Sequence, residues 1–263
     1  MEIQNRVFVS FDGQCPYNCK HCFSFECKQQ SPPRTLDQII ESLQNLSFDV
    51  IYVSQKRENF INPELGLLLC EKLFERYRCN IVIITRNVFS AINQERLISL
   101  KNKMSVYGKY LFIGVSIVGN ESACFTEDLS IAPSPMARIE FARTLYQKGL
   151  HTMLLIRPMF PEEIIPSHEW KSIVDQVAGS ISCIISGALM VNRDILIRLG
   201  LNETDLHYLI GGESEYLDGA IAGSMKFVDV RSELNQLKSY CHDHCIPFFE
   251  HSLPAINYLV NNS

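Results

Sequence analysis

The sequence lacks the features that mark several classes of protein. It contains no run of about 18 apolar residues, so we predict no membrane-spanning helix. Its first residues, MEIQNRVFVSF, lack a basic segment followed by an apolar one, so we expect no secretory signal and a cytoplasmic location. Positive charge is not in excess, because 24 Lys and Arg stand against 29 Asp and Glu. This balance argues against a broad nucleic-acid-binding face.

The chain does have an ordinary globular composition and ten cysteines. With 263 residues, 46% of them hydrophobic, it is expected to fold as one domain of the larger kind. Without an export signal, we expect no disulfide framework. Cysteines kept in a reducing compartment are buried hydrophobes, metal ligands or catalytic thiols. The apolar surroundings of Cys70, Cys79 and Cys183 predict that these three lie in the core.

Short apolar runs alternate with helical patterns along the chain. Strands are predicted at 6–11, 49–54, 80–85, 110–117, 151–157 and 181–187, with a closing strand at 246–250. The intervening helices have capping side chains at their starts, namely Thr35 with Gln38, Asn62 before Pro63, Ser90, and Ser134 before Pro135. Such alternation implies right-handed crossovers and a parallel sheet. We therefore predict an α/β fold, a partial (β/α)6 TIM-like barrel with mostly parallel strands in a single domain.

Further boundaries follow from local signals. The first helix is predicted to present one apolar face, formed by Ile39, Ile40, Leu43 and Leu46. Pro158 and Pro161 are predicted to end the fifth strand at Arg157. The pattern weakens and glycines gather from about 200 to 225, which predicts an insertion or lid. Residues 1–199 would then form the core, and residues 200–263 the lid, a helix near 231–245 and the closing strand.

Three cysteines follow the first predicted strand in the segment GQCPYNCKHCF. Three residues separate Cys15 from Cys19, and two separate Cys19 from Cys22. Structural zinc normally takes four protein ligands, and iron–sulfur clusters usually take four thiolates. Three thiolates on a four-iron cube leave one iron open for a small molecule, which indicates a catalytic centre. Zinc with Cys27 or His21 as the fourth ligand is the alternative.

The Cys-x-x-x-Cys-x-x-Cys spacing after the first strand of a parallel α/β unit resembles the signature of radical SAM enzymes. The resemblance implies a [4Fe-4S] cluster on Cys15, Cys19 and Cys22, with S-adenosyl-L-methionine (SAM) chelating the open iron. In that family, one-electron reduction cleaves SAM to methionine and a 5′-deoxyadenosyl radical, which takes hydrogen from a substrate. An external low-potential electron donor of flavodoxin or ferredoxin type is also implied. The stretch from Pro133 to Pro161, which includes Arg138, loosely resembles the spore photoproduct lyase branch.

The resemblance also implies a set of SAM contacts at the strand ends. His21 occupies the place of the aromatic residue that lies near the adenine. Ser54 and Gln55 stand where the family has a Gly-Gly-Glu motif for the methionine amino group. Ser116 ends the fourth strand, and Arg157 is placed to pair with the methionine carboxylate. The sequence 211–213 spells Gly-Gly-Glu too, but it follows the sixth strand and is treated as coincidence.

Active sites of parallel α/β barrels lie at the carboxyl ends of the strands. Polar residues gather there in this sequence, and the candidate substrate contacts are Arg57, Glu58, Arg86, Asn87 and, after the closing strand, His251. For each of these, a structural role in its loop is the alternative.

Three further cysteines lie in polar contexts. Cys124 follows the fourth strand and is a candidate hydrogen-atom donor or ligand of a second cluster. Cys241 and Cys245 share one helix face at i, i+4, so they are candidates to hold a second metal. The alternative is a helix end whose histidines favour its dipole.

The sequence therefore predicts a radical SAM enzyme with an unidentified substrate. Modification of a peptide or natural product is favoured over a nucleic-acid lesion or nucleotide, because the chain is acidic. The alternative from another class is a non-catalytic, zinc-binding regulatory module.

Overall fold

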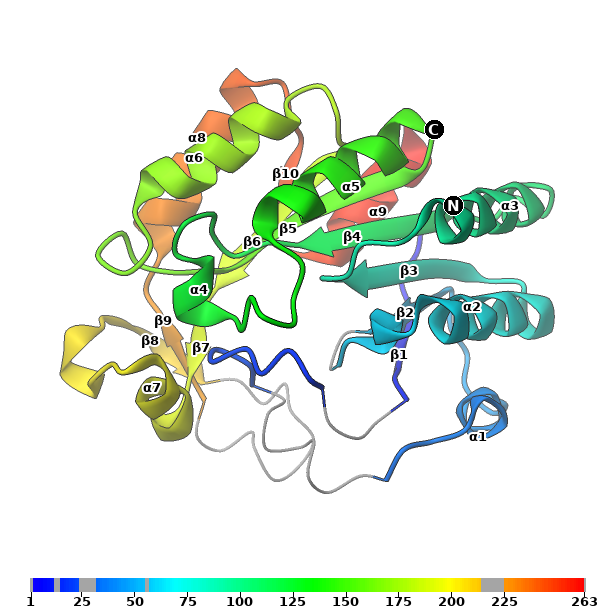
Figure 1. The fold of residues 1–263 in the computed structure, drawn as a ribbon, viewed down its shortest axis with the longest axis horizontal. Coiled ribbons are helices and arrows are strands. Elements are labelled where there is room, and N and C mark those ends of the chain that lie inside the picture. Colours follow the sequence, from blue (N-terminus) through cyan, green and yellow to red (C-terminus); the bar gives the residue numbers. More distant parts are fainter. Residues whose placement is uncertain (1, 12–14, 24–31, 55–56, 214–224, 263) are drawn as a thin grey trace.

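The computed structural model describes residues 2–11, 15–23, 32–54, 57–213 and 225–262. Within these ranges, no helix is both long enough and apolar enough to cross a bilayer. A parallel sheet runs through the middle of the molecule in the order β1-β2-β3-β4-β5-β6-β10 (Figure 1). Its strands are β1 (Arg6–Val9), β2 (Val50–Val53), β3 (Asn80–Thr85), β4 (Leu111–Ser116), β5 (His151–Met159), β6 (Cys183–Ala188) and β10 (Phe248–Phe249).

Both faces of this sheet are buried, which explains why its strands have no polar alternation. Successive side chains of a strand point to opposite faces. Ile51 and Val53 accordingly lie in the larger core on the outer face, whereas Val50 and Tyr52 lie in a second cluster on the inner face.

Helices cover the outer face of the sheet (Figure 1). They are α1 (Leu36–Glu41), α2 (Pro63–Tyr77), α3 (Ala91–Ser105), α5 (Pro135–Gln147), α6 (Ser167–Val177) and α8 (Arg231–Asp243). The predicted N-caps are confirmed, because Thr35, Asn62, Ser90 and Ser134 each accept a hydrogen bond from a backbone amide of the first helical turn. These caps fix the residue at which each of the four helices begins after the preceding loop.

The inner face is covered by α9 (Ser252–Asn261), a helix that the sequence analysis did not predict. Its buried residues Ala255, Ile256 and Leu259 pack against the inner side chains of β2 to β6. Asn257 exchanges hydrogen bonds of 2.7 and 2.9 Å with the backbone of Ile3, so the two ends of the chain lie together. The predicted closing strand 246–250 is correspondingly shorter, because the chain turns into this helix at residue 252.

A small antiparallel sheet, in the order β7-β9-β8, follows the main one. Its strands are β7 (Met190–Val191), β8 (Tyr208–Glu213) and β9 (Lys226–Val228), with helix α7 (Arg193–Leu199) and the 3-10 turn η3 (Glu203–Asp205) between β7 and β8. The described part of the predicted lid therefore holds regular structure. The Gly-Gly-Glu sequence 211–213 lies in β8 of this sheet, away from the end of β2.

Two further predicted boundaries are wrong. Helix α1 ends at Glu41 and is followed by i→i+3 turns, so the expected apolar face stops early and Leu46 is 53% exposed. Strand β5 continues through Pro158 to Met159 instead of ending at Arg157. Proline has no amide to donate, but the pairing with β6 is irregular between Ile156 and Met159, where that loss is tolerated.

Candidate metal centre at the strand ends

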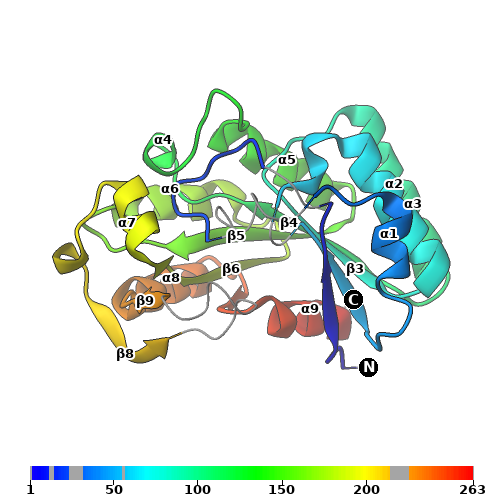
Figure 2. The same ribbon diagram turned by 90° about the horizontal axis from the view of Figure 1, so that it is seen from below.

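The cysteine loop, residues 15–22, lies at the carboxyl edge of the sheet after β1. In Figure 2 it runs between α4 (Ala123–Thr126) and α7. Cys15 and Cys19 are buried with Tyr17 and Ala132 in a small cluster apart from the main core, and the half-buried Cys22 packs against this cluster. The fold therefore gathers the three predicted ligands at the rim of the barrel.

A buried network of charges joins this loop to the neighbouring strand ends. Arg86, which follows β3, donates from Nε to Glu127 Oε1 at 3.0 Å, and its Nη2 lies 3.3 Å from His21 Nε2. The fully buried Arg138 of α5 donates to the other oxygen of Glu127 and, at 3.0 Å, to the carbonyl of Ser116. The network thus connects the cysteine loop, β3, β4 and α5.

The charges of this network set the ionisation of its members. Burial by itself raises the pKa of Glu127, but Arg86 and Arg138 outweigh it and hold the pKa at about 2. Burial raises the pKa of Cys19 to about 11, and the nearby Arg86 opposes that rise. Burial therefore outweighs Arg86 at Cys19, and Glu127 adds to the rise of its pKa.

His21, one of the predicted SAM contacts, is buried between two elements. A guanidinium only donates hydrogen bonds, so Nε2 of His21 is the acceptor from Arg86 and a neutral ring carries its proton on Nδ1. Its ring also meets the edge of Phe160, after β5, with centroids 6.0 Å apart. The imidazole is therefore held in one orientation at the rim.

The end of β2 has a strained backbone. Ser54 has φ +79°, in the left-handed region that favours glycine. Its Oγ accepts a hydrogen bond from the amide of Asn59 at 2.7 Å, and Asn59 Oδ1 accepts from the amide of Phe11 at 3.2 Å, after β1. The loops after β1 and β2 are thus joined where the resembled family has its glycines. Gln55 lies outside the described residues.

Glu58 and Asn87, two predicted substrate contacts, lie within hydrogen-bonded loops. Glu58 is buried, and its oxygens accept from Thr85 Oγ1 at 3.0 Å and from the amide of Arg86 at 2.7 Å. Burial raises the pKa of Glu58. Asn87 donates to the carbonyl of Phe60 and accepts from the next amide. These contacts hold the loops after β2 and β3 together.

Arg57 has a different environment. Its buried Nε has no hydrogen-bond partner among the described residues. The side chain lines a pocket of about 300 Å³ beside Arg34 and Phe11. Of the predicted substrate contacts, Arg57 and Glu58 line this pocket.

Ser116 is the last residue of β4, as predicted, whereas Arg157 lies within the neighbouring strand β5, two residues before its end at Met159. The guanidinium of Arg157 lies against Gly187, where a Cβ atom would be 3.3 Å from Nε. Glycine at 187 therefore leaves room for this side chain. Ser116 is buried, and its carbonyl accepts from Arg138.

The remaining candidates are more scattered. Cys124 lies in α4, next to the loop, but its side chain is not among those described, and Cys27 is outside the described residues. His251 is exposed at the start of α9.

Cys70, Cys79 and Cys183 are buried, as predicted. Cys241 is buried in the core whereas Cys245 is exposed, so these two side chains do not converge.

The donor set of the cysteine loop consists of three thiols, the ligand type that iron–sulfur clusters take. Among the described residues, no three His, Cys, Asp or Glu side chains are arranged to hold one metal ion. Thiolates on a zinc ion, at about 2.3 Å each, lie within about 4 Å of one another. A four-iron cluster takes one thiolate per iron, so its ligands are spaced more widely. Cys15, Cys19 and Cys22 would supply the thiolates for three irons of such a cluster and leave the fourth iron without a protein ligand.

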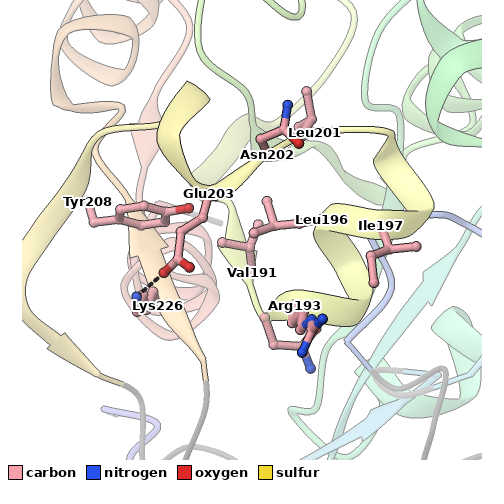
Figure 3. Close-up of a pocket in the computed structure, with 10 residues that line it drawn as sticks. Val191, Arg193, Leu196, Ile197, Leu201, Asn202, Glu203, Tyr208 and Lys226 are labelled. Atoms are coloured by element: carbon pink, nitrogen blue, oxygen red, sulfur yellow. Dashed lines mark hydrogen bonds and ion pairs between the residues drawn. The ribbon is translucent and has the colours of Figure 1, made fainter.

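A separate pocket of about 560 Å³ lies between α7 and the small sheet (Figure 3). Leu196 and Ile197 of α7 line one side, and Tyr208 the other. Lys226 pairs with Glu203 across the pocket and lies 5.2 Å from the ring centroid of Tyr208. The sequence analysis did not predict this pocket.

Sequence reasoning also missed the partners that hold the cysteine loop. Glu127, which joins two arginines, and Arg198, which reaches the loop from α7, follow no motif or periodicity. Arg198 contacts residues 176 and 178 positions away, so no local signal marks it.

No family model and no curated protein matches this chain. Solved structures do match. A spore photoproduct lyase mutant with bound AdoMet and dinucleoside spore photoproduct has TM-score 0.58 and 14% identity, over 88% of this chain and 71% of that one. A radical SAM methyltransferase from Sphaerobacter thermophilus has TM-score 0.60 and 11% identity, over 94% and 65%. Native anSMEcpe with bound AdoMet and a peptide has TM-score 0.50 and 13% identity, over 69% and 49%.

These similarities concern the fold. The predicted α/β architecture, a partial barrel of parallel strands, is confirmed, and the predicted resemblance to radical SAM enzymes holds at the level of the fold. The thiols of the cysteine loop lie at the carboxyl edge of that barrel.

Proposed function

We propose that this chain is a radical SAM enzyme whose [4Fe-4S] cluster is held by Cys15, Cys19 and Cys22. The observation that carries the proposal is the gathering of these three thiols at the carboxyl rim of a barrel with the radical SAM fold. Arg86 supports thiolate ligation, because its guanidinium opposes the rise that burial causes in the pKa of Cys19.

When bound, the cluster and SAM supply reductive cleavage of the sulfonium and a radical able to take hydrogen from an unactivated carbon. The protein contributes binding and orientation. Arg157 is proposed to pair with the methionine carboxylate, and the buried His21 to contact the adenine. Ser54, Gln55 and Ser116 are proposed to complete the SAM site. A flavodoxin- or ferredoxin-type protein in the cytoplasm would supply the electron.

For the substrate, we propose a peptide or natural product. The net charge of -5 disfavours a polyanionic substrate. Among the strand-end candidates, Arg57 has a buried Nε with no hydrogen-bond partner in the part of the chain that the structure describes. Among the similar structures, one holds a dinucleoside and another a peptide, so both classes belong in the test. Asn87, Arg86, Glu58 and His251 are proposed to contribute to the walls of the substrate site, and Cys124 is a candidate hydrogen-atom donor.

Anaerobic reconstitution with iron and sulfide tests the proposal. We expect a brown protein with about four irons per chain that forms 5′-deoxyadenosine from SAM when dithionite is added. Replacing the exposed Cys245 with Ala is the matched control and should retain both properties. A colourless protein that holds one tight zinc ion and forms no 5′-deoxyadenosine would exclude the enzyme and favour a zinc-binding module.

The substrate class requires a second assay. The active protein is incubated with short peptides or with a dinucleoside lesion in deuterated and unlabelled form. Deuterium transfer into 5′-deoxyadenosine from a peptide supports the proposed class. Transfer from the dinucleoside alone would replace it with nucleic-acid repair, without affecting the proposal that SAM is cleaved.

A further inference from the structure

Arg198 of α7 contacts the cysteine loop from a distant part of the chain. Its Nε donates to the carbonyl of Lys20 at 3.0 Å, and its Nη2 donates to the carbonyl of Cys22 at 2.9 Å. These two carbonyls flank His21. One planar guanidinium therefore spans the segment that leads to the third cysteine.

The contact completes the backbone hydrogen bonding of residues 20 and 22. The amide of Lys20 donates to the carbonyl of Thr126 at 2.9 Å, and the amide of Cys22 donates to the carbonyl of Cys19 at 3.0 Å. With Arg198, both backbone polar groups of residues 20 and 22 have a partner. Irregular backbone is held in one conformation when its polar groups are all used, and bonds from a charged donor are stronger than neutral ones.

Helix α7 provides a firm support for this side chain despite its seven residues. The side chain of Asn192 caps its start by accepting from the amide of Ile195 at 2.9 Å. Gly200 ends it with φ +69°, a conformation that glycine adopts without strain. Leu196 and Leu199 anchor the helix in the main core, so the guanidinium has a fixed base.

We propose that Arg198 is a positioning residue for the cluster. It fixes the backbone between Cys19 and Cys22 and thereby sets the direction in which these two side chains leave the loop. This inference rests on the proposed function, because it concerns the same three thiolates. Arg198 acts through two carbonyl oxygens and not through a cysteine sulfur.

Hydrogen–deuterium exchange of the full-length chain without cluster tests the positioning directly. We expect exchange in a peptide spanning residues 15–23 to rise about tenfold in Arg198→Ala. Arg198→Lys keeps the charge and the alkyl stem but lacks the planar fork, so its exchange should be intermediate. Arg143→Ala, on the exposed face of α5, is the matched control and should match the wild type.

Wild-type exchange in both Arg198 variants would overturn the inference. If Arg198→Ala does not fold, Arg198→Lys decides: faster exchange confined to the loop supports positioning, and wild-type exchange rejects it.

The reconstituted protein gives the second readout. We expect Arg198→Ala to shift the electron paramagnetic resonance spectrum of the reduced cluster, and Arg198→Lys to restore it in part. A residue that only stabilised α7 would leave that spectrum unchanged, which would reject the inference. If the wild type holds no cluster, the proposed function fails, while the exchange experiment still tests whether Arg198 holds the loop. If the wild type forms 5′-deoxyadenosine and Arg198→Ala shows wild-type exchange and spectrum, only this inference fails.

Discussion

Residues 15–22 and residues 241–245 both place two or more cysteines and a histidine in one short segment, at spacings that suit a metal. The first segment lies at the carboxyl rim of the sheet. Its thiols share one small cluster, and the half-buried Arg86 lies near Cys19. The second ends helix α8, and its thiols are divided between the core and solvent. The spacing of potential ligands is therefore not sufficient for a metal site. The position of the segment at the strand ends and the charged residues around it distinguish the first segment from the second.

The histidines of the two segments differ in the same way. His21 is buried and accepts from Arg86 within the charge network. His244 bonds the carbonyl of Tyr240, one turn earlier in the helix, and pairs with the half-exposed Asp175 at 3.0 Å. The second arrangement is that of a helix C-terminus with favourable charge at its end.

The largest predicted effect is on bound iron, when one thiol is removed from each segment in turn. Cys19→Ser is expected to reduce bound iron from about four per chain to near zero and to abolish 5′-deoxyadenosine formation, because a cluster with an open iron cannot lose a ligand. Cys241→Ser is expected to retain both. Iron analysis after anaerobic reconstitution checks the pair. Equal iron loss in the two variants would mean that both segments hold metal.

The charge network gives the second difference. Glu127→Gln leaves Arg138 buried without its carboxylate, so the free energy of unfolding should fall by about 3 kcal/mol at pH 7. Asp175→Asn in α6, which removes the exposed partner of His244 at the end of α8, should cost about 1 kcal/mol or less. Urea unfolding of the protein without cluster measures both. Similar losses would show that burial does not distinguish the two regions.

The stabilising effect of Glu127 on the fold is also expected to depend on pH. The pKa of Glu127 is about 2 in the folded protein, below its ordinary value of 4.5. Its ionised form therefore stabilises the fold fully above about pH 4.5, and this contribution is lost as the pH falls towards 2. The difference in the free energy of unfolding between the wild type and Glu127→Gln should therefore become smaller as the pH falls from 4.5 towards 2. A constant gap from pH 7 to pH 3 would show that the charge of Glu127 is not what stabilises the fold.

A residue in the left-handed conformation occurs at the end of β2, Ser54 at φ +79°, and another in the second segment, Cys245 at φ +56°. Ser54→Val adds a β-branch to that conformation and removes the acceptor for Asn59, so it should destabilise the fold by about 2 kcal/mol. Ser54→Gly relieves the backbone strain and serves as the control, with a change below about 1 kcal/mol. A mild effect of valine would show that the loop after β2 adapts freely.

Much of this arrangement follows from local sequence signals. The apolar runs predict the strands, and capping residues such as Asn62 and Ser134 predict where helices start. The cysteine spacing predicts the loop, and parallel strands bring their carboxyl ends to one edge. These features depend on neighbours within a few residues or on a general rule of topology.

Other features depend on contacts between distant residues. Helix α9 is short and follows a two-residue strand, so local sequence gives little sign of it. The helix is stabilised by packing against the inner face of the sheet. Arg198 and Glu127 acquire their roles only when the chain brings them to the loop. Pro158 inside β5 contradicts a local rule, because the irregular pairing with β6 tolerates it. Sequence patterns predict the loop that carries the thiols, but not the residues that hold it.

The smallest predicted effect concerns Cys245, the residue after the C-cap of α8. The amide of Ile246 donates a hydrogen bond to the carbonyl of Cys241 at 2.8 Å. The amide of Cys245 donates to the carbonyl of His242 at 2.9 Å. This pair of bonds is the Schellman motif, whose left-handed residue is usually glycine. Cys245→Gly should therefore stabilise the protein by about 1 kcal/mol in urea unfolding. Iron content should stay unchanged, since the conformation of Cys245 is explained by ending a helix. A loss of iron in this variant would instead assign Cys245 to a metal and remove the contrast with the cysteine loop.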